Sequence, residues 1–317
     1  MSRKYKIAFV GLGSIGKRHF NNVCIFLSGR SDEYEIDLYR SNLSRQLPPD
    51  ITDRCHRQIH FQNDIEDGLN YDVVFITNPT FLHAATIEKF HGHTKSFFIE
   101  KPIFDSLGID ASLLKRLDKV PSYVACPLRY TPVLQYVKQY VDCSKAISVR
   151  AISSSYLPDW RSGQDYRQCY SAHRDMGGGV GIDLIHEWDY LTTLFGMPKK
   201  VYSIQEQISP LEIDSDDIAI YIAKTDSATI ELHLDYFGRK TLRSMDIFMP
   251  DDTIHCDIAD GKVEYLKAGK QILLNAERNA FQMEEIRHFF AIIDGEIAND
   301  SDALHAYQVL KLTKGLI

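Results

Sequence analysis

The sequence predicts an α/β protein with an N-terminal Rossmann domain, built on a doubly wound parallel sheet, and a C-terminal α/β domain with a largely antiparallel open sheet. Short apolar runs alternate with helical stretches in the first third of the chain. A glycine-rich turn follows the first of these runs, and strands with in–out alternation dominate the later part. A length of 317 residues also favours two domains.

The composition is that of an ordinary globular protein, with 44% hydrophobic and 25% charged residues. The chain carries 36 basic and 43 acidic side chains, so its formal net charge is −7 at pH 7. A net negative chain has no global electrostatic reason to bind nucleic acid or an anionic membrane. Any phosphate that it binds must therefore be held by a local binding motif.

The cysteines lie far apart in the sequence, without a C-x-x-C pair or a zinc-finger spacing, and no metal site is expected. They are Cys24, Cys55, Cys126, Cys143, Cys169 and Cys256. We interpret them as reduced thiols in a reducing compartment. The first residues lead directly into a strand-like segment, without a signal peptide, and no apolar run reaches membrane-spanning length. The expected location is the cytoplasm.

Short apolar runs in the first third of the chain predict the strands of the first domain. These runs are residues 7–10, 36–39, 73–76 and 97–99. Residues 15–27 and 83–90 lie between them and have the spacing of amphipathic helices. Parallel strands require crossover connections, so this alternation predicts a doubly wound sheet. We expect the dinucleotide-binding domain to span residues 1–121.

The pattern changes around residues 121–132, and the later strands alternate more regularly between polar and apolar residues. The expected strands are residues 146–156, 218–223, 229–236 and 244–249. Helices are expected after Gly179 and over residues 279–293. We expect a substrate and oligomerisation domain over residues 122–300, followed by a C-terminal helix within 301–317 that begins at Ser301.

The sequence GLGSIG, from Gly11 to Gly16, follows the first strand and opens a helix, which is the context that this motif requires. The first glycine permits a tight turn, Gly13 lets the backbone approach a pyrophosphate, and Gly16 lets helix and strand pack closely. Ser14 and Ile15 then open the helix whose N-terminus would hold the anion. The alternative is a glycine-rich turn without a ligand.

The end of the second strand favours NADP over NAD. An acid at this position accepts the ribose hydroxyls of NAD, but here the strand ends in Arg40 and Ser41. A cation followed by a hydroxyl suits a 2′-phosphate through charge-assisted hydrogen bonds. Asp37 lies too far back in the strand to be a ribose ligand. The alternative for Arg40 is an exposed arginine on a solvated loop.

Three further motifs occur in a characteristic order after the glycine turn. They are Asn78-Pro79-Thr80-Phe81-Leu82-His83, Glu100-Lys101-Pro102, and Gly177-Gly178-Gly179 followed by Asp183, His186 and Asp189. With these motifs the chain resembles the Gfo/Idh/MocA family of oxidoreductases, which includes glucose–fructose oxidoreductase and inositol dehydrogenase. The resemblance covers nearly the whole chain and extends to Arg129-Tyr130 before Pro132 and to Trp160-Arg161.

The resemblance implies the activity and the architecture of the protein. Family members move a hydride between a nicotinamide and a carbon of a sugar, cyclitol or related polyol. Their open sheet often mediates oligomers, here expected to be a homodimer or homotetramer. Their C-terminal helix packs back on the cofactor domain.

The resemblance also implies roles for particular residues. Lys101 lies beside the nicotinamide and the reacting hydroxyl, and it is followed by an expected cis bond to Pro102. Glu100 belongs to the same cofactor-binding motif. Asn78 and Pro79 border the nicotinamide ribose. A separate expectation places His83 near the pyrophosphate, and Asp183 and His186 approach the substrate from the second domain.

Oxidation of a secondary alcohol needs a positioned proton acceptor. On one helix, Asp183, His186, Glu187 and Tyr190 would fall within about 80° of arc, opposite an apolar face. His186 is the expected general acid/base because an imidazole titrates near neutral pH. Asp183 would fix its tautomer or contact the substrate. The two are three residues apart, whereas many family members have four, so the choice of base stays open. Lys101 would stabilise the developing alkoxide.

The segment before the three glycines contains the candidate substrate-binding residues Trp160 and Arg161, to which the resemblance adds Arg129. Arg161, Arg167 and Arg174 would suit an anionic substrate such as a sugar acid or a sugar nucleotide. Solvated loop arginines are the alternative.

Three functions are compatible with these residues. The leading hypothesis is an NAD(P)-dependent dehydrogenase or ketosugar reductase. The second is a sugar–sugar oxidoreductase or redox-assisted glycosidase that keeps its nicotinamide bound. The third is a dinucleotide-binding sensor without turnover. Retention of nucleotide through gel filtration would separate the first two, and absence of hydride exchange would favour the third.

Overall fold

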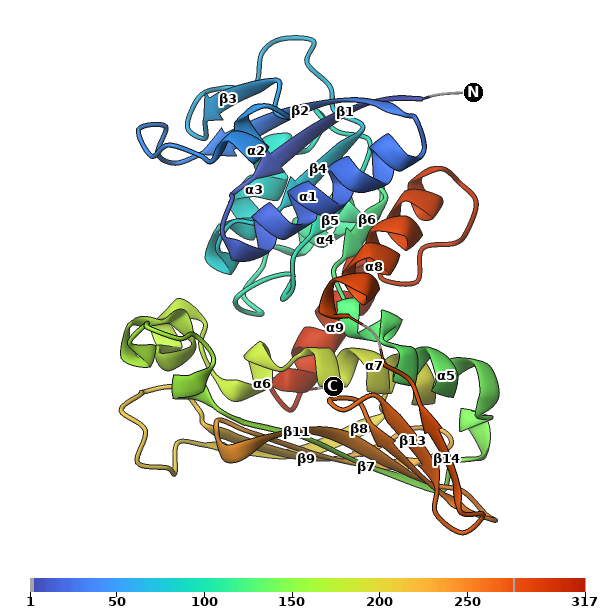
Figure 1. Cartoon of the computed structure of the whole chain (residues 1–317). Coiled ribbons are helices and arrows are strands. Elements are labelled where there is room, and N and C mark those ends of the chain that lie inside the picture. The colour runs from blue at the N-terminus through green and yellow to red at the C-terminus, as the bar shows by residue number, and fades with distance from the viewer. Residues whose placement is uncertain (1–2, 276, 317) are drawn as a thin grey trace. The chain divides into compact units, whose positions relative to one another are not determined.

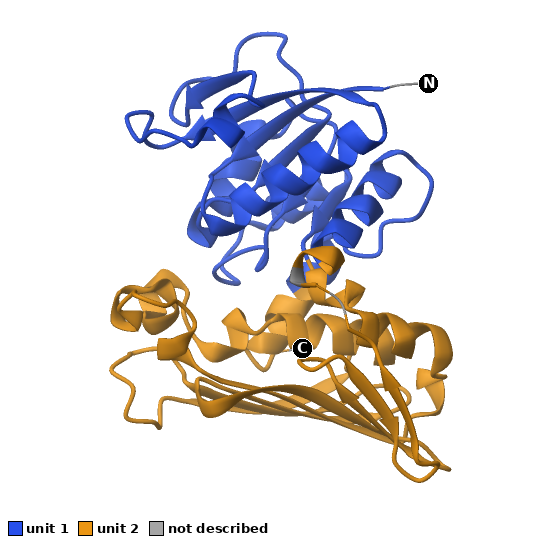
Figure 2. Cartoon of the chain, in the orientation of Figure 1, with its two compact units in different colours: residues 1–125, 282–307 blue, residues 126–281, 308–317 orange. Residues whose placement is uncertain are grey.

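The computed structural model describes residues 3–275 and 277–316. It contains two compact units (Figure 2). Unit 1 comprises residues 1–125 and 282–307, and unit 2 comprises residues 126–281 and 308–317. These bounds differ from the divisions expected at residues 121 and 300, because the last strand of the first sheet and most of a late helix belong to unit 1.

Unit 1 is built on a parallel sheet in the order β3-β2-β1-β4-β5-β6 (Figure 1). The strands are β1 (Lys4–Val10), β2 (Glu33–Arg40), β3 (Arg57–His60), β4 (Val73–Ile76), β5 (Phe97–Ile99) and β6 (Ser122–Val124). Every neighbouring pair in this order is parallel. The doubly wound parallel sheet is thus confirmed, and its strand order reverses between β1 and β4, where such sheets bind ligands.

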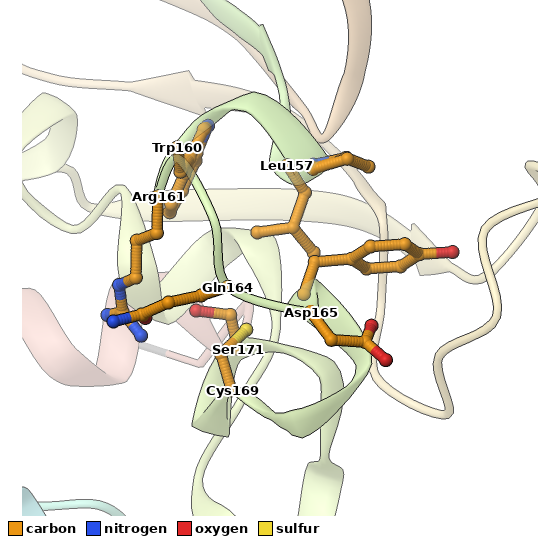
Figure 3. Close-up of a pocket in the computed structure, with 9 residues that line it drawn as sticks. Leu157, Trp160, Arg161, Gln164, Asp165, Cys169 and Ser171 are labelled. Carbon is orange, nitrogen blue, oxygen red and sulfur yellow. The ribbon is translucent and has the colours of Figure 1, made fainter.

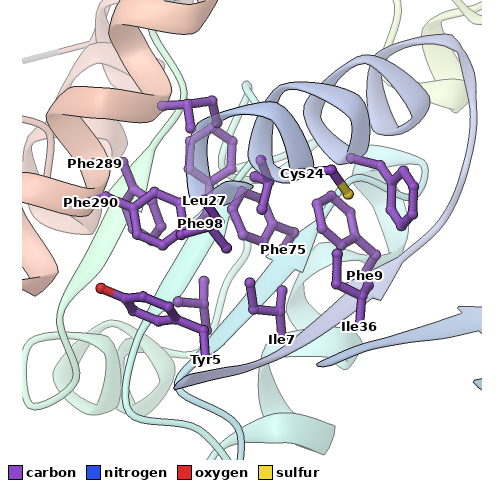
Figure 4. Close-up of a cluster of buried hydrophobic side chains, with 14 of the residues drawn as sticks. Tyr5, Ile7, Phe9, Cys24, Leu27, Ile36, Phe75, Phe98, Phe289 and Phe290 are labelled. Atoms are coloured by element: carbon purple, nitrogen blue, oxygen red, sulfur yellow. The ribbon is translucent and has the colours of Figure 1, made fainter. Parts of the chain in front are cut away.

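Helices cover this sheet and complete its core. They are α1 (Ser14–Gly29), α2 (Pro49–Thr52), the 3₁₀ turn η1 (Thr80–Leu82), α3 (His83–Phe90), α4 (Ala111–Leu117) and, from residue 282, α8 (Arg278–Ile293). Figure 4 shows Leu27 of α1 and Phe289 of α8 in one cluster with Phe75 and Phe98 of the sheet. The ring of Phe289 lies 5.2 Å from that of Phe98, edge to face. The core of unit 1 therefore includes residues from near the end of the chain.

Unit 2 contains the second sheet, in the order β14-β13-β12-β11-β7-β10-β9-β8. Its strands are β7 (Ser148–Tyr156), β8 (Lys200–Glu206), β9 (Ile218–Lys224), β10 (Thr229–Asp235), β11 (Phe237–Phe248), β12 (Thr253–Asp257), β13 (Lys262–Tyr265) and β14 (Lys270–Leu273). Only β7 and β10, among the described strands of this sheet, pair in parallel. The prediction of a largely antiparallel sheet is confirmed.

The helices of unit 2 lie along one face of this sheet (Figure 1). They are α5 (Pro132–Tyr140), α6 (Val180–Asp183), α7 (His186–Phe195) and the last part of α9 (Ala303–Thr313). Short 3₁₀ turns connect them to the strands: η2 (Pro127–Tyr130), η3 (Cys143–Lys145), η4 (Leu157–Asp159), η5 (Tyr166–Gln168), η6 (Tyr170–Ala172) and η7 (Arg174–Met176). Among the described residues of unit 2, no helix covers the opposite face, so the sheet is open as predicted.

Two helix boundaries differ from the expected ones. The helix expected after Gly179 is interrupted, because Leu184 has non-helical backbone angles (φ −95°, ψ 27°) between α6 and α7. At the last helix, Asp302 caps the N-terminus by accepting a hydrogen bond from the backbone N–H of His305. The hydroxyl of Ser301, which was expected to cap it, donates instead to the carbonyl oxygen of Val124.

All six cysteines are free thiols in the structure. Within residues 3–275 and 277–316, no helix combines the length and the apolar character that a membrane span requires.

Candidate active site

The glycine turn joins β1 to α1 and packs tightly against the end of β4. Gly11 has a positive φ of +90°, and a Cβ atom there would lie 2.7 Å from the backbone of Asn78. A Cβ atom on Gly16 would lie 2.6 Å from the hydroxyl oxygen of Thr77. Only glycine fits at these two positions, because a Cβ atom at either one would lie closer to its neighbour than van der Waals contact allows.

Gly13 faces open space instead, since a Cβ atom there would meet no described heavy atom within 4 Å. It is the N-cap of α1, makes no side-chain capping hydrogen bond, and is followed by a first turn without an acidic residue. The backbone N–H groups of Ser14 and Ile15 open a helix whose first N–H groups have no partner within the helix. This arrangement fits the pyrophosphate of a dinucleotide.

Asn78 supplies a second feature that fits a bound cofactor. Its side-chain nitrogen donates to the hydroxyl of Thr86 at 2.8 Å. Its side-chain oxygen is buried and has no hydrogen-bond partner among the described residues. A buried acceptor without a donor is unfavourable, so this oxygen fits a ligand hydroxyl. Pro79 follows it at the start of η1.

His83 holds the surrounding loops in place. It is fully buried, with Nε2 3.0 Å from the carbonyl oxygen of Asn78 and Nδ1 3.1 Å from that of Ile103. Burial, which disfavours the charged ring, lowers the pKa of His83. Because both ring nitrogens face main-chain oxygens, neither is available to a pyrophosphate. His83 therefore positions the loop that carries Asn78.

The end of β2 carries a buried cation, Arg40, that forms no ion pair with any described acid. Arg40 donates to the side-chain oxygen of Gln58 and to the carbonyl oxygen of Arg45. Burial and the nearby charge of Arg45 lower the pKa of Arg40. Asp37 is 1% exposed and pairs with Arg57 at 3.0 Å, which agrees with its exclusion as a ribose ligand. Arg45 could not be predicted from the sequence, because only the fold of residues 41–45 brings its charge near Arg40.

Glu100 and Lys101 follow β5, at the carboxyl edge of the sheet. The carboxylate of Glu100 lies 2.5 Å from Nε2 of His19, which is fully buried on α1, and it accepts the backbone N–H of Lys101 at 3.1 Å. Although burial opposes ionisation, the hydrogen bond with His19 and the charges of His19 and Lys101 lower the pKa of Glu100. The bond between Lys101 and Pro102 is cis, as expected.

His19 is a residue that the sequence analysis missed. It lies on α1, one turn beyond Gly16. Its ring packs edge to face on that of Phe98, with the ring centres 4.9 Å apart. Its position relative to the glycines was a usable signal, because a histidine there faces the sheet rather than the solvent.

Within unit 2, Asp183 and His186 lie on either side of the interruption between α6 and α7. Asp183 is buried and accepts a hydrogen bond from the hydroxyl of Tyr236 at 2.6 Å. The charge of Asp183, a hydrogen bond to it and burial raise the pKa of Tyr170 well above its usual range. Burial and the same carboxylate raise the pKa of Tyr236. Both phenols therefore stay protonated and hold Asp183 in one orientation.

The polar stripe expected on this helix is largely internal. Glu187 is fully buried and accepts from Nε of Arg243 at 2.8 Å, and Tyr190 is buried beside it. His186, at the first position of α7, is half-buried. Among these side chains, Asp183 and His186 remain the candidates for contact with a substrate, while Glu187 and Tyr190 belong to the interior of unit 2.

The candidate arginines of unit 2 differ in their surroundings. Arg129 forms a buried bidentate pair with Asp189, at 2.6 Å and 2.5 Å, so it supports the interior rather than a substrate. Arg167 pairs with Asp165 and Glu212. Arg174 pairs with Asp216 at 3.0 Å. These acids, distant in sequence in most cases, neutralise arginines that the sequence pattern suggested for an anionic substrate. Arg161 and Trp160 line a pocket.

The fold and the glycine turn are those of a dinucleotide-binding domain, which is followed by an α/β domain. Residues 5–119 match the Gfo/Idh/MocA model, described as an oxidoreductase family with an NAD-binding Rossmann fold. This part of the chain is therefore similar to the NAD-binding domain of that family. The chain is 27% identical over 158 residues to D-xylose dehydrogenase of Paenarthrobacter nicotinovorans, an alignment that covers 47% of this chain and 40% of that enzyme.

Solved structures of similar fold cover both units of the chain. Levoglucosan dehydrogenase in complex with NADH has a TM-score of 0.82 and 17% identity, covering 99% of this chain and 96% of that one. The WlbA dehydrogenase of Bordetella pertussis, in complex with NADH and UDP-GlcNAcA, has a TM-score of 0.78 and 16% identity, covering 99% and 95%. Myo-inositol 2-dehydrogenase of Lactobacillus plantarum has a TM-score of 0.76 and 17% identity, covering 98% and 95%. These likenesses establish the fold.

Proposed function

We propose that the protein is an NAD(P)-dependent oxidoreductase that acts on a secondary alcohol or ketone of a sugar, a polyol or a related compound. The observation that carries the proposal is the open space at Gly13, beside an α1 N-terminus without a side-chain cap or an acid in its first turn. The unpartnered buried oxygen of Asn78 supports it, because it fits a ribose hydroxyl. The match of residues 5–119 to the model of an NAD-binding oxidoreductase family agrees with both.

The nicotinamide supplies or accepts the hydride when it is bound. In this proposal, the ammonium of Lys101 stabilises the developing negative charge on the substrate oxygen. His186 takes the hydroxyl proton in oxidation and returns it in reduction. Asp183, held by Tyr170 and Tyr236, accepts a hydrogen bond from the substrate or orients His186. The carboxylate of Glu100 positions Lys101 by accepting a hydrogen bond from the backbone N–H of Lys101.

We propose a preference for NADP over NAD. The two cations at the end of β2, Arg40 and Arg45, are close enough for their charges to interact. A 2′-phosphate would relieve that repulsion, with the hydroxyl of Ser41 as a further donor. The acid nearest to this position in β2, Asp37, is buried in pairs with Arg57 and His56, so it is not available to ribose hydroxyls.

A matched pair of glycine substitutions tests the cofactor site. Gly13→Val and Gly29→Val both place the new side chain in space without a described neighbour within 4 Å, at opposite ends of α1. We expect Gly13→Val to weaken binding of NADP and NAD at least 100-fold, measured by calorimetry, and Gly29→Val to leave it within about two-fold. Equal affinities in both variants would contradict the proposed pyrophosphate site at the N-terminus of α1.

Turnover is measured with a panel of sugars, polyols and ketosugars by following absorbance at 340 nm. Exchangeable cofactor and hydride transfer to the panel are the expected results. Nucleotide that stays with the protein through gel filtration would favour the enzyme that recycles its bound cofactor. Nucleotide binding without any hydride exchange would favour the sensor and contradict the proposed oxidoreductase.

We propose that the open face of the unit 2 sheet binds a second copy of the chain, giving a homodimer or homotetramer. Tyr202 and Ile204 are 60% and 58% exposed on this face, next to exposed Ile222. The same face also carries the pair Arg150–Glu231, so both signs of charge are present, as a self-complementary interface requires. Light scattering of Ile204→Asp tests this, with a shift to monomer expected.

We also propose that the protein acts in the cytoplasm, because its cysteines are free thiols and a reducing compartment keeps thiols reduced.

A further inference from the structure

A pocket in unit 2 lies within the segment that precedes the three glycines (Figure 3). Its lining residues are Leu157, Pro158, Trp160, Arg161, Gln164, Asp165, Tyr166, Cys169 and Ser171. The space between these residues is small and partly open to solvent. It therefore fits one small group rather than a nucleoside diphosphate.

The charge in this pocket is unbalanced. Arg161 forms no ion pair with any carboxylate of residues 3–275 or 277–316, and its guanidinium lies 5.6 Å from the centre of the Tyr170 ring. The carboxylate of Asp165, the acidic residue in the lining, pairs with Arg167 at 2.9 Å. Figure 3 shows this carboxylate directed away from the guanidinium of Arg161. The pocket therefore presents a cation without a matching acid.

The pocket is also lined by a buried polar group, the hydroxyl of Ser171. Ser171 is 1% exposed, and its hydroxyl, which lies near that of Tyr170, makes no hydrogen bond of ordinary geometry with the described residues. A buried hydroxyl in that state is unfavourable, because it has lost its hydrogen bonds to water. The side-chain amide of Gln164 lines the same space. A ligand with acceptor oxygens would satisfy the hydroxyl and the guanidinium together.

The walls of the pocket connect it to Asp183. Trp160 packs edge to face on Tyr236, with ring centres 5.3 Å apart, and Tyr236 donates to the Asp183 carboxylate. Tyr170, under the Arg161 guanidinium, also holds Asp183. A Cβ atom on Gly178 would lie 2.6 Å from the carbonyl oxygen of His173, so this glycine lets the chain just before α6 pack closely against residues 170–173.

We propose that this pocket binds an anionic group, a carboxylate or a phosphate, carried by the substrate sugar, and that Arg161 and the hydroxyl of Ser171 are its ligands. The proposal rests on the proposed function, because it assigns the substituent that lies near the hydroxyl held at Asp183. The planar guanidinium suits the oxygens of either group. The preferred substrates are then sugar acids or sugar phosphates rather than neutral sugars.

The binding test uses Trp160 as the reporter, since the chain has only two tryptophans and Trp160 lines the pocket. Fluorescence is followed while inorganic phosphate, and separately acetate, is titrated into wild type, Arg161→Gln and Arg174→Gln, whose arginine lies outside the lining and pairs with Asp216. We expect saturable quenching in wild type and Arg174→Gln, and its loss in Arg161→Gln. The signal must also disappear in Trp160→Phe. No saturable response, or equal responses in both arginine variants, overturns the proposal.

The kinetic test compares neutral sugars with their uronic acids and their phosphates. In wild type we expect kcat/KM to be higher for one anionic series, and Arg161→Gln to reduce that advantage about 10–100-fold while neutral sugars change little. The favoured series identifies carboxylate or phosphate. A uniform loss for neutral and anionic sugars would contradict the pocket's role. Specific anion binding without turnover of any sugar supports the pocket and overturns only the proposed oxidoreductase.

Discussion

Nε2 of His19 lies 2.5 Å from the carboxylate of Glu100, so the helix that begins at the glycine turn is bonded directly to the residue before Lys101. The other carboxylate oxygen of Glu100 accepts the Lys101 N–H. The proposed pyrophosphate site and the proposed catalytic lysine are thus parts of one hydrogen-bonded unit. His19 acts through Glu100, and we regard both as positioning residues.

We expect His19→Ala to lower kcat about ten-fold, with the KM of the cofactor within about three-fold, because the anion site remains intact while Lys101 loses its support. The pH profile of kcat should also shift, since Glu100 loses its partner, whereas simple destabilisation would not move it. His91→Ala, at a half-buried histidine elsewhere in unit 1, is the control. An unchanged kcat and pH profile in His19→Ala would rule out the positioning role.

The lowered pKa of Glu100 predicts a pH dependence of stability. Because its pKa is lower in the folded state, the unfolded state binds more protons, and stability rises with pH in that range. The contribution is complete above the unfolded value of about 4.5 and is lost as the pH falls through the folded value. Urea unfolding at pH 6 and pH 3.5 should therefore show a smaller loss in Glu100→Gln than in wild type. Glu88→Gln, at an exposed glutamate, should behave like wild type.

Lys101 and His186 are predicted to act on one hydroxyl, so their substitutions should not be additive. We expect Lys101→Ala to lower kcat about 10²–10³-fold, with cofactor affinity within a few-fold. His186→Ala should lower it by a similar order. The double variant should lose much less than the product of the two single effects. Strictly multiplicative losses would indicate independent roles, and near-normal turnover in Lys101→Ala would remove the lysine from the mechanism.

The cofactor preference depends on the two cations after β2. We expect Arg40→Ala and Arg45→Ala each to lower the ratio of kcat/KM for NADP to that for NAD about ten-fold, because each removes a charge near the proposed 2′-phosphate. The ratio is insensitive to partial loss of folded protein, which matters because Arg40 is buried. Arg116→Ala, which breaks an exposed pair with Glu88, is the control. An unchanged ratio in both variants would refute the NADP preference.

The buried pair Arg129–Asp189 is predicted to stabilise unit 2. Removing one partner of a buried ion pair costs about 3–5 kcal/mol, because the other charge stays buried. Asp189→Asn should therefore lower the unfolding free energy by that order, whereas Arg116→Ala should change it by at most about 1 kcal/mol. Chemical unfolding, followed by circular dichroism, measures both. A small effect in Asp189→Asn would reopen a substrate role for Arg129.

The sequence predicted those features that depend on local patterns. Apolar runs located the parallel strands, and the positions of Gly11 and Gly16 identified close packing that the structure explains by the contacts with Asn78 and Thr77. Helical periodicity could not reveal the interruption at Leu184, because the apolar spacing continues through it. In that case tertiary packing decided the backbone conformation.

The parts of the site that the sequence did not predict depend on distant residues. Tyr236 reaches Asp183 from the end of β10, and no spacing rule relates the two. Glu212 and Asp216 neutralise Arg167 and Arg174 in the same way. A group of arginines in one segment therefore indicates an anion site only after the fold has shown which of them form no ion pair with an acidic side chain.

The discontinuity of unit 1 has a consequence for synthesis of the protein. Phe289 and Phe290 belong to the same core as Phe9 and Phe75, yet they are translated after all strands of unit 2. Domains generally fold as units on the ribosome, N-terminal parts first. Here the nascent dinucleotide-binding sheet must wait, with part of its apolar face uncovered, until almost the entire polypeptide has emerged. A fragment cut after residue 125 would lack that cover and should aggregate rather than bind nucleotide.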